Sequence, residues 1–96
     1  MPLAFEWDQR KADANWKKHS VRFAEAASVF SDPQARIFKD EDHSDEETRE
    51  IIIGYSPAKH LLLVCFTEIE RERIRIISAR RAVRRERRDY EERGTI

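Results

Sequence analysis

The sequence has few of the residues that cross-link or interrupt a chain. Its 96 residues include one cysteine, two glycines and three prolines. Because Cys65 is alone and lies inside the apolar run LLLVCFT, a disulfide scaffold is excluded and a reducing compartment fits this usage. With so little glycine and proline, no linker divides the chain. We therefore expect residues 1–96 to form a single domain with one modest core.

Long apolar runs are also missing. No stretch approaches the ~20 consecutive apolar residues of a membrane span, and the N-terminus MPLAFEWDQRK lacks the apolar segment of a secretory signal. These absences predict a cytoplasmic protein that does not contact a membrane. A zinc site of the usual spacing is excluded as well, because His19, His43, His60 and Cys65 are widely scattered.

Neither sign of charge is in excess overall, but the distribution along the chain is uneven. The 19 basic side chains balance 19 acidic ones. Residues 1–70 carry 9 basic and 14 acidic side chains, whereas residues 71–96 carry 10 and 5. This asymmetry predicts a C-terminal region that binds anions. Carboxylates and a histidine between residues 40 and 45 are interpreted as an acidic surface loop, so we predict no metal and no other cofactor; they are Asp40, Asp42, His43 and Asp45.

Hydrophobic spacing predicts two helices after a short extended start at Ala4–Trp7. Asp8 is suited to cap the first helix, which runs to about Lys18. The second helix covers Phe23–Phe30, where apolar residues recur at the three- and four-residue spacing of one helix face. Trp16 is assigned to the inner face of the first helix.

The middle of the chain predicts strands. Ala35–Asp40 and the β-branched run Ile51–Ile53 have the composition of short strands. Leu61–Thr67 is apolar without alternation, as in a central strand that is covered on both faces. Arg73–Ser78 alternates between charged and apolar residues, which predicts the last strand of the sheet.

A closing helix is predicted from about Arg80 to Arg93, capped by Ser78 or Ala79. Its inner stripe is expected to contain Ala79, Ala82, Val83, Glu86 and Tyr90. Two N-terminal helices, an antiparallel sheet of about four strands and this C-terminal helix make an α+β domain.

Seven segments together resemble the BrnT family. They are FEWD at 5–8, NWKKHSVRF at 15–23, AEAASVFSDP at 24–33, HSDEETR at 43–49, IIIG at 51–54, RIISAR at 75–80 and ERRDY at 86–90. The resemblance implies a small fold similar to the RelE ribonucleases, and a type II toxin that blocks translation by cutting RNA. It also implies a BrnA-like ribbon-helix-helix antitoxin, with two toxins per antitoxin dimer and operator DNA contacted through the antitoxin.

Three positions depart from the family pattern. Ser20 replaces the usual glycine after the histidine, which restricts the left-handed conformation at the turn between the helices. Arg22 stands where a serine or threonine commonly caps the second helix, although Glu25 keeps the other half of a capping box. The arginine that often follows the central strand is absent at Ile69 and Glu70, and Arg71 is the candidate to replace it.

Cutting RNA without a metal ion requires a base, an acid and cations for the charge that collects on the phosphoryl oxygens. The resemblance implies that arginine, lysine and tyrosine fill these roles, and the catalytic cations proposed from it are Lys18, Arg75 and Arg80. Arg80 is expected at the first turn of the last helix, where it would grip one phosphate together with Arg75 and the free helix N–H groups. The alternatives are an ion pair between Arg75 and the loop 41–47, and a solvated surface position for Lys18.

Three further catalytic candidates each have a second interpretation. His19 is suited to general acid–base chemistry, or simply caps its helix. Glu86 is either a base or half of an internal ion pair with Arg49 or Arg75. Tyr90 either serves an RNA base or phosphate, or packs in the core. His43 and His60 are assigned to the surface.

The remaining arginines are expected to bind RNA or the antitoxin, and the RNA-binding set is Arg73, Arg81, Arg84 and Arg87. Trp7 and Trp16 are candidates for base stacking, but a core position is favoured for both. The alternative to a nuclease is a non-catalytic module that uses the basic C-terminal helix to bind nucleic acid or protein. Composition and pattern alone favour that alternative, and the family resemblance reverses the ranking.

Overall fold

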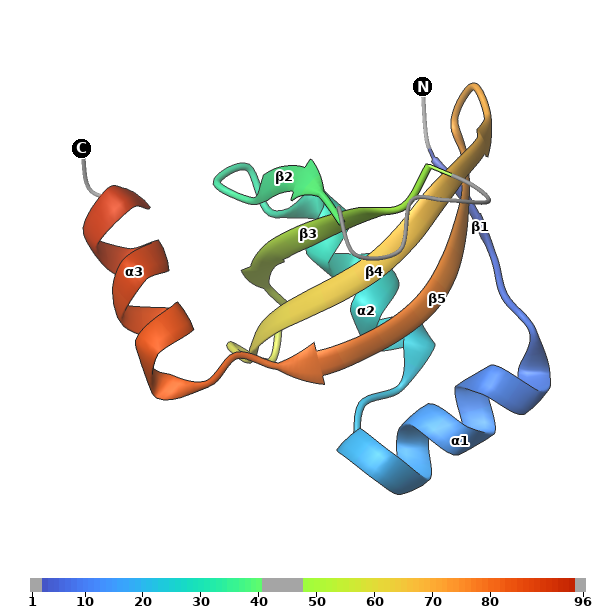
Figure 1. The fold of residues 1–96 in the computed structure, drawn as a ribbon, viewed down its shortest axis with the longest axis horizontal. Helices are drawn as coiled ribbons and strands as arrows, with labels where there is room; N and C mark the ends of the chain where they lie inside the picture. The colour runs from blue at the N-terminus through green and yellow to red at the C-terminus, as the bar shows by residue number, and fades with distance from the viewer. Residues whose placement is uncertain (1–2, 41–47, 95–96) are drawn as a thin grey trace.

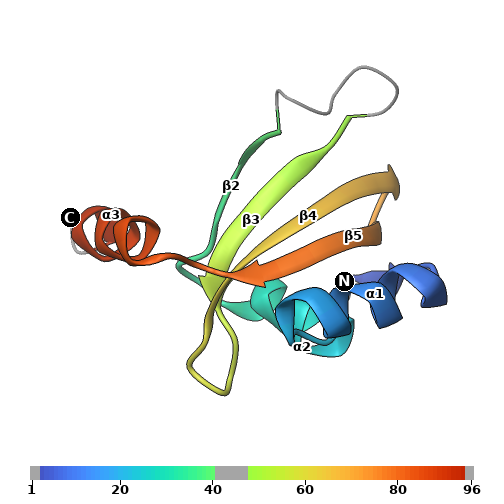
Figure 2. The same ribbon diagram turned by 60° about the horizontal axis from the view of Figure 1, so that its bottom comes forward.

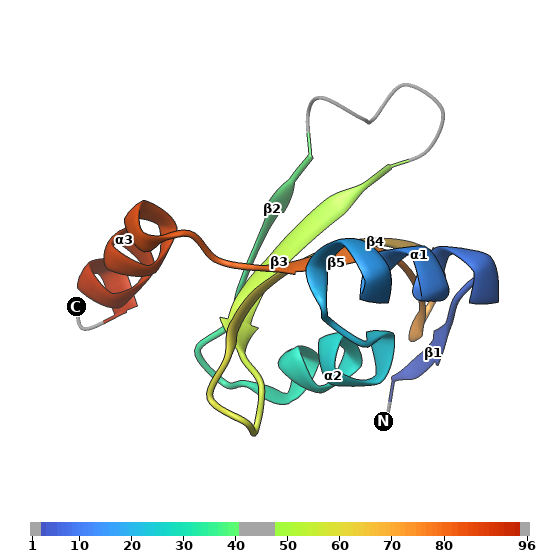
Figure 3. The same ribbon diagram turned by 90° about the horizontal axis from the view of Figure 1, so that it is seen from below.

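The computed structural model describes residues 3–40 and 48–94. It is an α+β fold in which a twisted sheet carries two helices on one face, with a third helix set apart at one end (Figure 1). Figure 3 shows α1 and α2 on the same side of the sheet and α3 separated from both. The expected fold class is confirmed. None of the described helices is long and apolar enough to cross a membrane.

The elements follow the predicted order, with one addition at the N-terminus. They are β1 (Ala4–Glu6), α1 (Gln9–His19), α2 (Phe23–Ser28), the 3-10 turn η1 (Val29–Ser31), β2 (Arg36–Lys39), β3 (Glu50–Tyr55), β4 (Leu61–Glu70), β5 (Arg73–Arg81) and α3 (Arg84–Gly94).

The sheet has the order β1-β5-β4-β3-β2. Strands β2 to β5 form an antiparallel meander, and β4 is central, as its unbroken apolar run predicts. The fifth strand, beyond the four expected, is β1, which pairs parallel to β5 with Phe5 opposite Ile74. A three-residue strand has too little pattern of its own to be predicted, because its pairing depends on β5.

The core lies between the sheet and the two N-terminal helices. Its fully buried side chains include Val21, Phe23, Val29, Leu62, Val64 and Ile76. The helical face predicted for the second helix is therefore confirmed, because Phe23 and Ala26 are buried and the chain continues as η1 with Val29 also buried.

The capping box predicted for α2 does not form. Arg22 makes no side-chain cap bond and its guanidinium lies 4.1 Å from the centre of the Trp16 ring. The Glu25 carboxylate instead accepts hydrogen bonds from Ser56 Oγ and from His60 Nδ1, both at 2.7 Å. His60, assigned to the surface from sequence, is thus half-buried in a contact between α2 and the β3–β4 turn.

The tryptophans are more exposed than expected, with exposed fractions of 36% for Trp7 and 44% for Trp16. The prediction that both belong to the core is wrong. For Trp16 the physical reason is the rotation of α1, because Ala12 and Asn15 rather than Ala12 and Trp16 form its inward face; Trp7 precedes α1 and covers Phe23 edge-to-face at 5.9 Å with its outer part exposed. Consecutive helix positions point about 100° apart, so burial of Asn15 turns Trp16 toward solvent.

The boundary between β5 and α3 also differs from the prediction. Arg80 lies in β5, opposite Leu63, and α3 begins only at Arg84. The pairing of β4 with β5 contains a bulge, because Cys65 lies opposite Ser78 but Phe66 lies opposite Ile76. The extra residue in β5 shifts the alternation of its side chains, so that Ala79 faces the core while the strand continues to pair with β4. Ala79 is therefore not on a helix, and Val83 is 54% exposed rather than on an inner stripe.

Asn15 is the buried polar residue that joins α1 to the sheet. Its Nδ2 donates to the carbonyl oxygens of Ala79 and Val21, both at 2.9 Å, and its Oδ1 accepts from Ala79 N–H at 3.0 Å. The side chain thus pairs with both backbone groups of Ala79, at the end of β5 where β1 no longer runs alongside. Only 6% of Asn15 is exposed, so these bonds are made away from water.

Replacing this amide should lower stability strongly. We expect Asn15→Ala to reduce the free energy of unfolding by about 2–4 kcal/mol, because buried backbone groups of Ala79 and Val21 lose their partners. Asn15→Asp should also destabilise, since a carboxylate cannot donate to the two carbonyls. Urea unfolding followed by circular dichroism measures both, and a loss below about 1 kcal/mol for both variants would contradict the structural role.

Ser20 adopts the left-handed conformation that the family's glycine would favour, with φ 57° and ψ 35°. Its N–H donates to the Trp16 carbonyl at 2.9 Å and ends α1. A non-glycine residue there is strained by about 1–2 kcal/mol.

We expect Ser20→Gly to raise the free energy of unfolding by about 0.5–1 kcal/mol, after the greater backbone entropy of glycine is subtracted. Ser20→Ala is the control, since it keeps the strain, and an equal gain in both variants would contradict this explanation.

Candidate functional site

The face of the sheet opposite α1 and α2 is open over much of its area. Figure 2 shows α1 and α2 beneath the sheet and α3 beyond its end. Alternate residues of the central strands point to this open face, and they are Ile51 and Ile53 of β3 and Leu63 and Cys65 of β4, all outside the main core. Two neighbouring hollows lie on this apolar floor and share Leu63.

The first hollow, which we call the cationic hollow, has a volume of about 240 Å³. Its apolar floor includes Ile51, Leu63, Cys65 and Ile77, its charged or ionisable rim residues are His19, Asp40, Arg49 and Arg80, and Ser78 and Ala79 complete the lining. These four rim residues come from the end of α1, from the two chain segments that flank residues 41–47, and from β5. The tertiary structure therefore brings three basic groups and one carboxylate around a space suited to a small anionic or aromatic group.

The second hollow lies beneath α3 and has a volume of about 200 Å³. Phe38, Ile53, Leu63 and Tyr90 supply its apolar lining. Arg36, Glu86 and Asp89 complete its lining, so it is less basic than the cationic hollow. Of the predicted site residues, Glu86 and Tyr90 lie here, whereas His19 and Arg80 line the cationic hollow.

Arg80 and Glu86 form a bidentate ion pair between the two hollows. Nη1 and Nη2 of Arg80 donate to the two Glu86 oxygens, both at 2.8 Å. Oε1 of Glu86 also accepts the Val83 N–H at 2.9 Å, which caps the start of α3. The hydrogen bond from Arg80 holds the pKa of the Glu86 carboxyl below its usual value against the effect of burial, and the same bond raises the pKa of Arg80. The internal ion pair expected for Glu86 exists, but its partner is Arg80, not Arg49 or Arg75.

Tyr90 anchors α3 to the sheet. It is the buried residue of the described part of α3, with 6% exposed, and its hydroxyl donates to the Gln34 carbonyl at 2.9 Å. Burial first, and then the negative charge of Asp32, raise the pKa of the Tyr90 hydroxyl above its usual value. Its ring packs edge-to-face on Tyr55 at 5.9 Å. The packing interpretation of Tyr90 therefore applies in the free protein.

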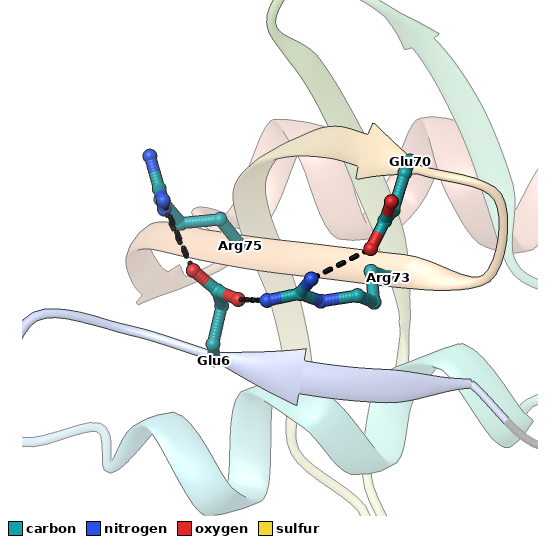
Figure 4. Close-up of polar contacts among 4 residues, drawn as sticks. All are labelled: Glu6, Glu70, Arg73 and Arg75. Carbon is teal, nitrogen blue, oxygen red and sulfur yellow. Dashed lines mark hydrogen bonds and ion pairs between the residues drawn. The ribbon is translucent and has the colours of Figure 1, made fainter.

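Arg75 lies near the start of β5, whereas Arg80 lies near its end; the contacts of Arg75 are drawn in Figure 4. Its Nε and Nη2 donate to Glu6 Oε2 at 3.2 and 3.0 Å, while Arg73 bridges Glu6 and Glu70, each at 2.6 Å. The hydrogen bond from Arg73, followed by that from Arg75, lowers the pKa of Glu6. Arg75 lines a separate hollow beside β1, so the expectation that Arg75 and Arg80 grip one phosphate at a helix N-terminus is wrong.

The remaining predicted basic residues lie around the site rather than inside it. Lys18 is exposed and is not part of the lining of the cationic hollow. Arg84 and Arg87 are exposed on α3, and Arg81 is exposed at the end of β5, with Nη2 at 3.4 Å from His60 Nε2. Arg71 is exposed in the turn between β4 and β5. These five exposed side chains lie on separate elements, namely α1, the turn between β4 and β5, the end of β5, and α3.

Sequence reasoning missed two rim residues of the cationic hollow. The sequence pattern points to Arg49 only as a partner for Glu86, and to Asp40 only as part of an acidic cluster. The pairing of β2 with β3 is the feature that would have identified both residues. The Asp40 N–H donates to the Arg49 carbonyl at 3.0 Å, which continues the β2–β3 hydrogen bonds by one pair and places the two residues side by side. Within the described ranges no group of three or more metal-ligating side chains occurs, and the predicted loop members Asp42, His43 and Asp45 lie outside those ranges.

The Arg80–Glu86 pair should make stability depend on pH. Because the folded state lowers the pKa of Glu86 from 4.5, its contribution is fully present above that value and is lost as the pH falls through the folded pKa. We expect Glu86→Gln to be less stable than the parent by about 1 kcal/mol at pH 7, discounted for partial exposure of the pair. Urea unfolding from pH 7 to pH 3 measures this difference, which should shrink below about pH 4.5; a constant difference would contradict the ion-pair origin.

Both the sequence and the fold match one family of known proteins. Residues 7–86 match the family described as ribonuclease toxin, BrnT, of type II toxin-antitoxin system. The fold is similar to the crystal structure of the Brucella abortus ribonuclease toxin, BrnT, with a TM-score of 0.68 and 25% sequence identity, covering 85% of this chain and 99% of that chain. No curated protein matches the sequence. The resemblance read from the seven sequence segments is thus confirmed, and the chain belongs to the BrnT family of ribonuclease toxins, which act on RNA and pair with an antitoxin.

Proposed function

We propose that this protein is an endoribonuclease toxin that cuts RNA at the cationic hollow by attack of the ribose 2′-hydroxyl on the adjacent phosphate, without a metal ion. The observation that carries the proposal is the convergence of His19, Arg49 and Arg80 over an apolar floor on the open face of the sheet. Cations in an apolar setting stabilise the charge that develops on a phosphoryl group more strongly than cations in water do.

Arg80 is the proposed phosphate clamp. Its pair with Glu86 uses Nη1 and Nη2, which leaves the Nε edge of the guanidinium for phosphate oxygens. The same pair fixes the guanidinium in one orientation, and a preorganised donor loses little entropy when it binds. On this view Glu86 is a positioning residue for Arg80 rather than a base.

His19 is the proposed acid–base group, since it is the described histidine at the rim of the hollow and imidazole exchanges protons near neutral pH. Lys18 is the neighbouring cation that would contact the substrate backbone outside the hollow. Tyr90 supports the site by holding α3 in position. Its hydroxyl has a raised pKa and donates a hydrogen bond to the Gln34 carbonyl.

The surrounding arginines are proposed to form an electrostatic track for RNA and a surface for the antitoxin. Arg73 and Arg75 lie at one end of β5, and Arg81, Arg84 and Arg87 lie at the other end and on α3. We propose that a BrnA-like ribbon-helix-helix antitoxin, as a dimer bound to two toxins, covers this basic surface, blocks RNA and supplies the DNA contacts. When the toxin is free of its antitoxin, its cleavage of RNA would stop translation.

The nuclease proposal predicts cleavage of naked RNA in excess EDTA, with 2′,3′-cyclic phosphate ends. We expect Arg80→Ala to lower the cleavage rate about 100-fold or more, as for loss of one transition-state donor, with little change in the fold. Arg75→Ala should act mainly through RNA affinity, because its hollow is separate. Chemical mapping of the new 3′ ends and single-turnover rates measure these effects.

Arg10→Ala is the matched control, because it removes an exposed arginine of α1 that does not line the hollow.

The logarithm of the RNA-binding constant should fall linearly with the logarithm of the salt concentration, with a slope of about 0.7 for each phosphate neutralised. If Arg80→Ala, folded and soluble, cuts at the parent's rate, then the assignment of the cationic hollow is wrong. Salt-sensitive binding without cleavage on naked RNA or on translating ribosomes would favour a non-catalytic RNA-binding module.

A further inference from the structure

A further hollow lies where α1 begins beside β5, and we call it the Trp7 hollow. Its volume is about 280 Å³, and its lining consists of Glu6, Trp7, Asp8, Lys11, Arg75 and Ile76. It uses the first half of β5 and the first turn of α1, whereas the cationic hollow uses the second half of β5 and the last residue of α1. The two hollows therefore lie along the same pair of elements.

Two lysines on one face of α1 connect the hollows. Lys11 lines the Trp7 hollow, and Lys18 precedes the rim residue His19. They are seven positions apart, so they share a helix face and are separated by about 10.5 Å along its axis. Ala14, between them, is small and exposed. An extended chain therefore has room to pass over this face of the helix.

The two ammonium groups have no partner of their own. Within the described residues, neither Lys11 nor Lys18 makes an ion pair, whereas Arg75 and Arg80 both do. A cation without an internal partner binds a phosphate without first breaking an ion pair. The face of α1 between the hollows is therefore suited to the backbone of a nucleic acid.

Trp7 supplies a stacking surface in its hollow. Its ring is 36% exposed, and the buried Phe23 ring holds it edge-to-face at 5.9 Å. A ring that the core holds in place loses little entropy when a base stacks on it. Trp16 is less suited to this role, because the guanidinium of Arg22 already lies over its ring at 4.1 Å from the centre.

The two carboxylates of the Trp7 hollow are engaged within the protein. Glu6 accepts hydrogen bonds from the guanidinium groups of Arg73 and Arg75 (Figure 4). Oδ1 of Asp8 caps α1 by accepting two backbone N–H groups, at 2.8 and 3.3 Å. The ammonium of Lys11 therefore remains as the cation of this hollow that is available to a ligand.

We propose that the Trp7 hollow is a second RNA subsite, in which Trp7 stacks a base while Lys11 and Lys18 bind the phosphates between the two hollows. Proteins that bind single strands combine a basic groove with exposed aromatic rings in this way. Stacked nucleotides rise by about 3.4 Å each, so the ~10.5 Å between the lysines covers about three nucleotides. Continuity with the cationic hollow favours RNA over a protein as the occupant. This inference rests on the proposed function and extends its substrate to a single strand that reaches beyond the scissile bond.

Intrinsic fluorescence tests the stacking directly, because Trp7 and Trp16 are the two tryptophans of the chain. The probe is a 2′-O-methyl oligouridylate of about ten nucleotides, which has no 2′-hydroxyl for the proposed cleavage. In Trp16→Phe, where Trp7 is the remaining fluorophore, we expect the probe to quench the emission strongly. In Trp7→Phe, where Trp16 remains, we expect little quenching.

Affinity for the same probe tests the phosphate contact. Lys11→Gln should weaken binding and lower the log–log salt slope by about 0.7, the value for one phosphate on a single strand. Trp7→Ala should weaken binding about tenfold or more, as for the loss of one stacked base. Lys17→Gln is the matched control, because Lys17 points about 120° away from Lys11 on the same helix and lines neither hollow. It should keep the parent's affinity and slope.

Cleavage of a long RNA provides a further readout, in which Lys11→Gln should raise KM more than it lowers kcat. Absence of quenching in Trp16→Phe, or cleavage by Lys11→Gln with the parent's KM, would overturn the subsite and leave the nuclease standing. Quenching of Trp7 without cleavage of any RNA would leave the subsite standing and overturn the nuclease. If the purified antitoxin alters the emission of Trp7 and the oligonucleotide does not, the hollow is a protein contact and the proposal is wrong. Circular dichroism shows whether each variant is folded.

Discussion

The paired hydrogen bonds between the Asn15 amide and the backbone of Ala79 are the contact on which the rest of the structure depends. Their partners are separated by 64 positions in the chain, and they join α1 to the end of β5 in addition to the apolar packing of Ala12 on the core. His19 lies one helical turn after Asn15, and Arg80 directly follows Ala79. A single buried amide therefore sets the distance between two rim residues of the cationic hollow.

Several arginines of this protein are held in local ion pairs. Arg73 and Arg75 share Glu6, Arg80 is paired with Glu86, and Arg87 lies 4.0 Å from Glu91. The pairs of Arg73, Arg75 and Arg87 are largely exposed, so they contribute little to folding. The Arg80–Glu86 pair is bidentate and less exposed, so it holds the guanidinium of Arg80 in one orientation.

The helix α3 is attached differently from α1 and α2. The two N-terminal helices bury apolar side chains against the sheet, whereas α3 is held by Tyr90, by Glu86 and by the bond from the Tyr55 hydroxyl to Glu91 at 2.9 Å. This attachment leaves Arg84, Arg85, Arg87 and Arg88 exposed. It also leaves the open face of the sheet uncovered next to it, and this is where the cationic hollow lies.

The sequence by itself determined the features that depend on neighbours a few residues away. The spacing of Phe23 and Ala26 predicted α2, the Asp8 side chain predicted the start of α1 and accepts the N–H groups of Arg10 and Lys11, and the unbroken apolar run predicted β4 as the central strand. The seven segments also identified the family. Helical period, capping and β-propensity are local properties, so they can be read without the fold.

Only the tertiary structure decided which partners distant residues have. The strand β1, the extension of β5 through Arg80 and the burial of Asn15 instead of Trp16 all arise from pairing with segments far away in the chain, and the residues themselves carry no local signal for it. The ion pair of Arg75 with Glu6, and the presence of Asp40 and Arg49 at one hollow, follow from the sheet register. Function depends on these long-range contacts, because a site is made where distant segments meet.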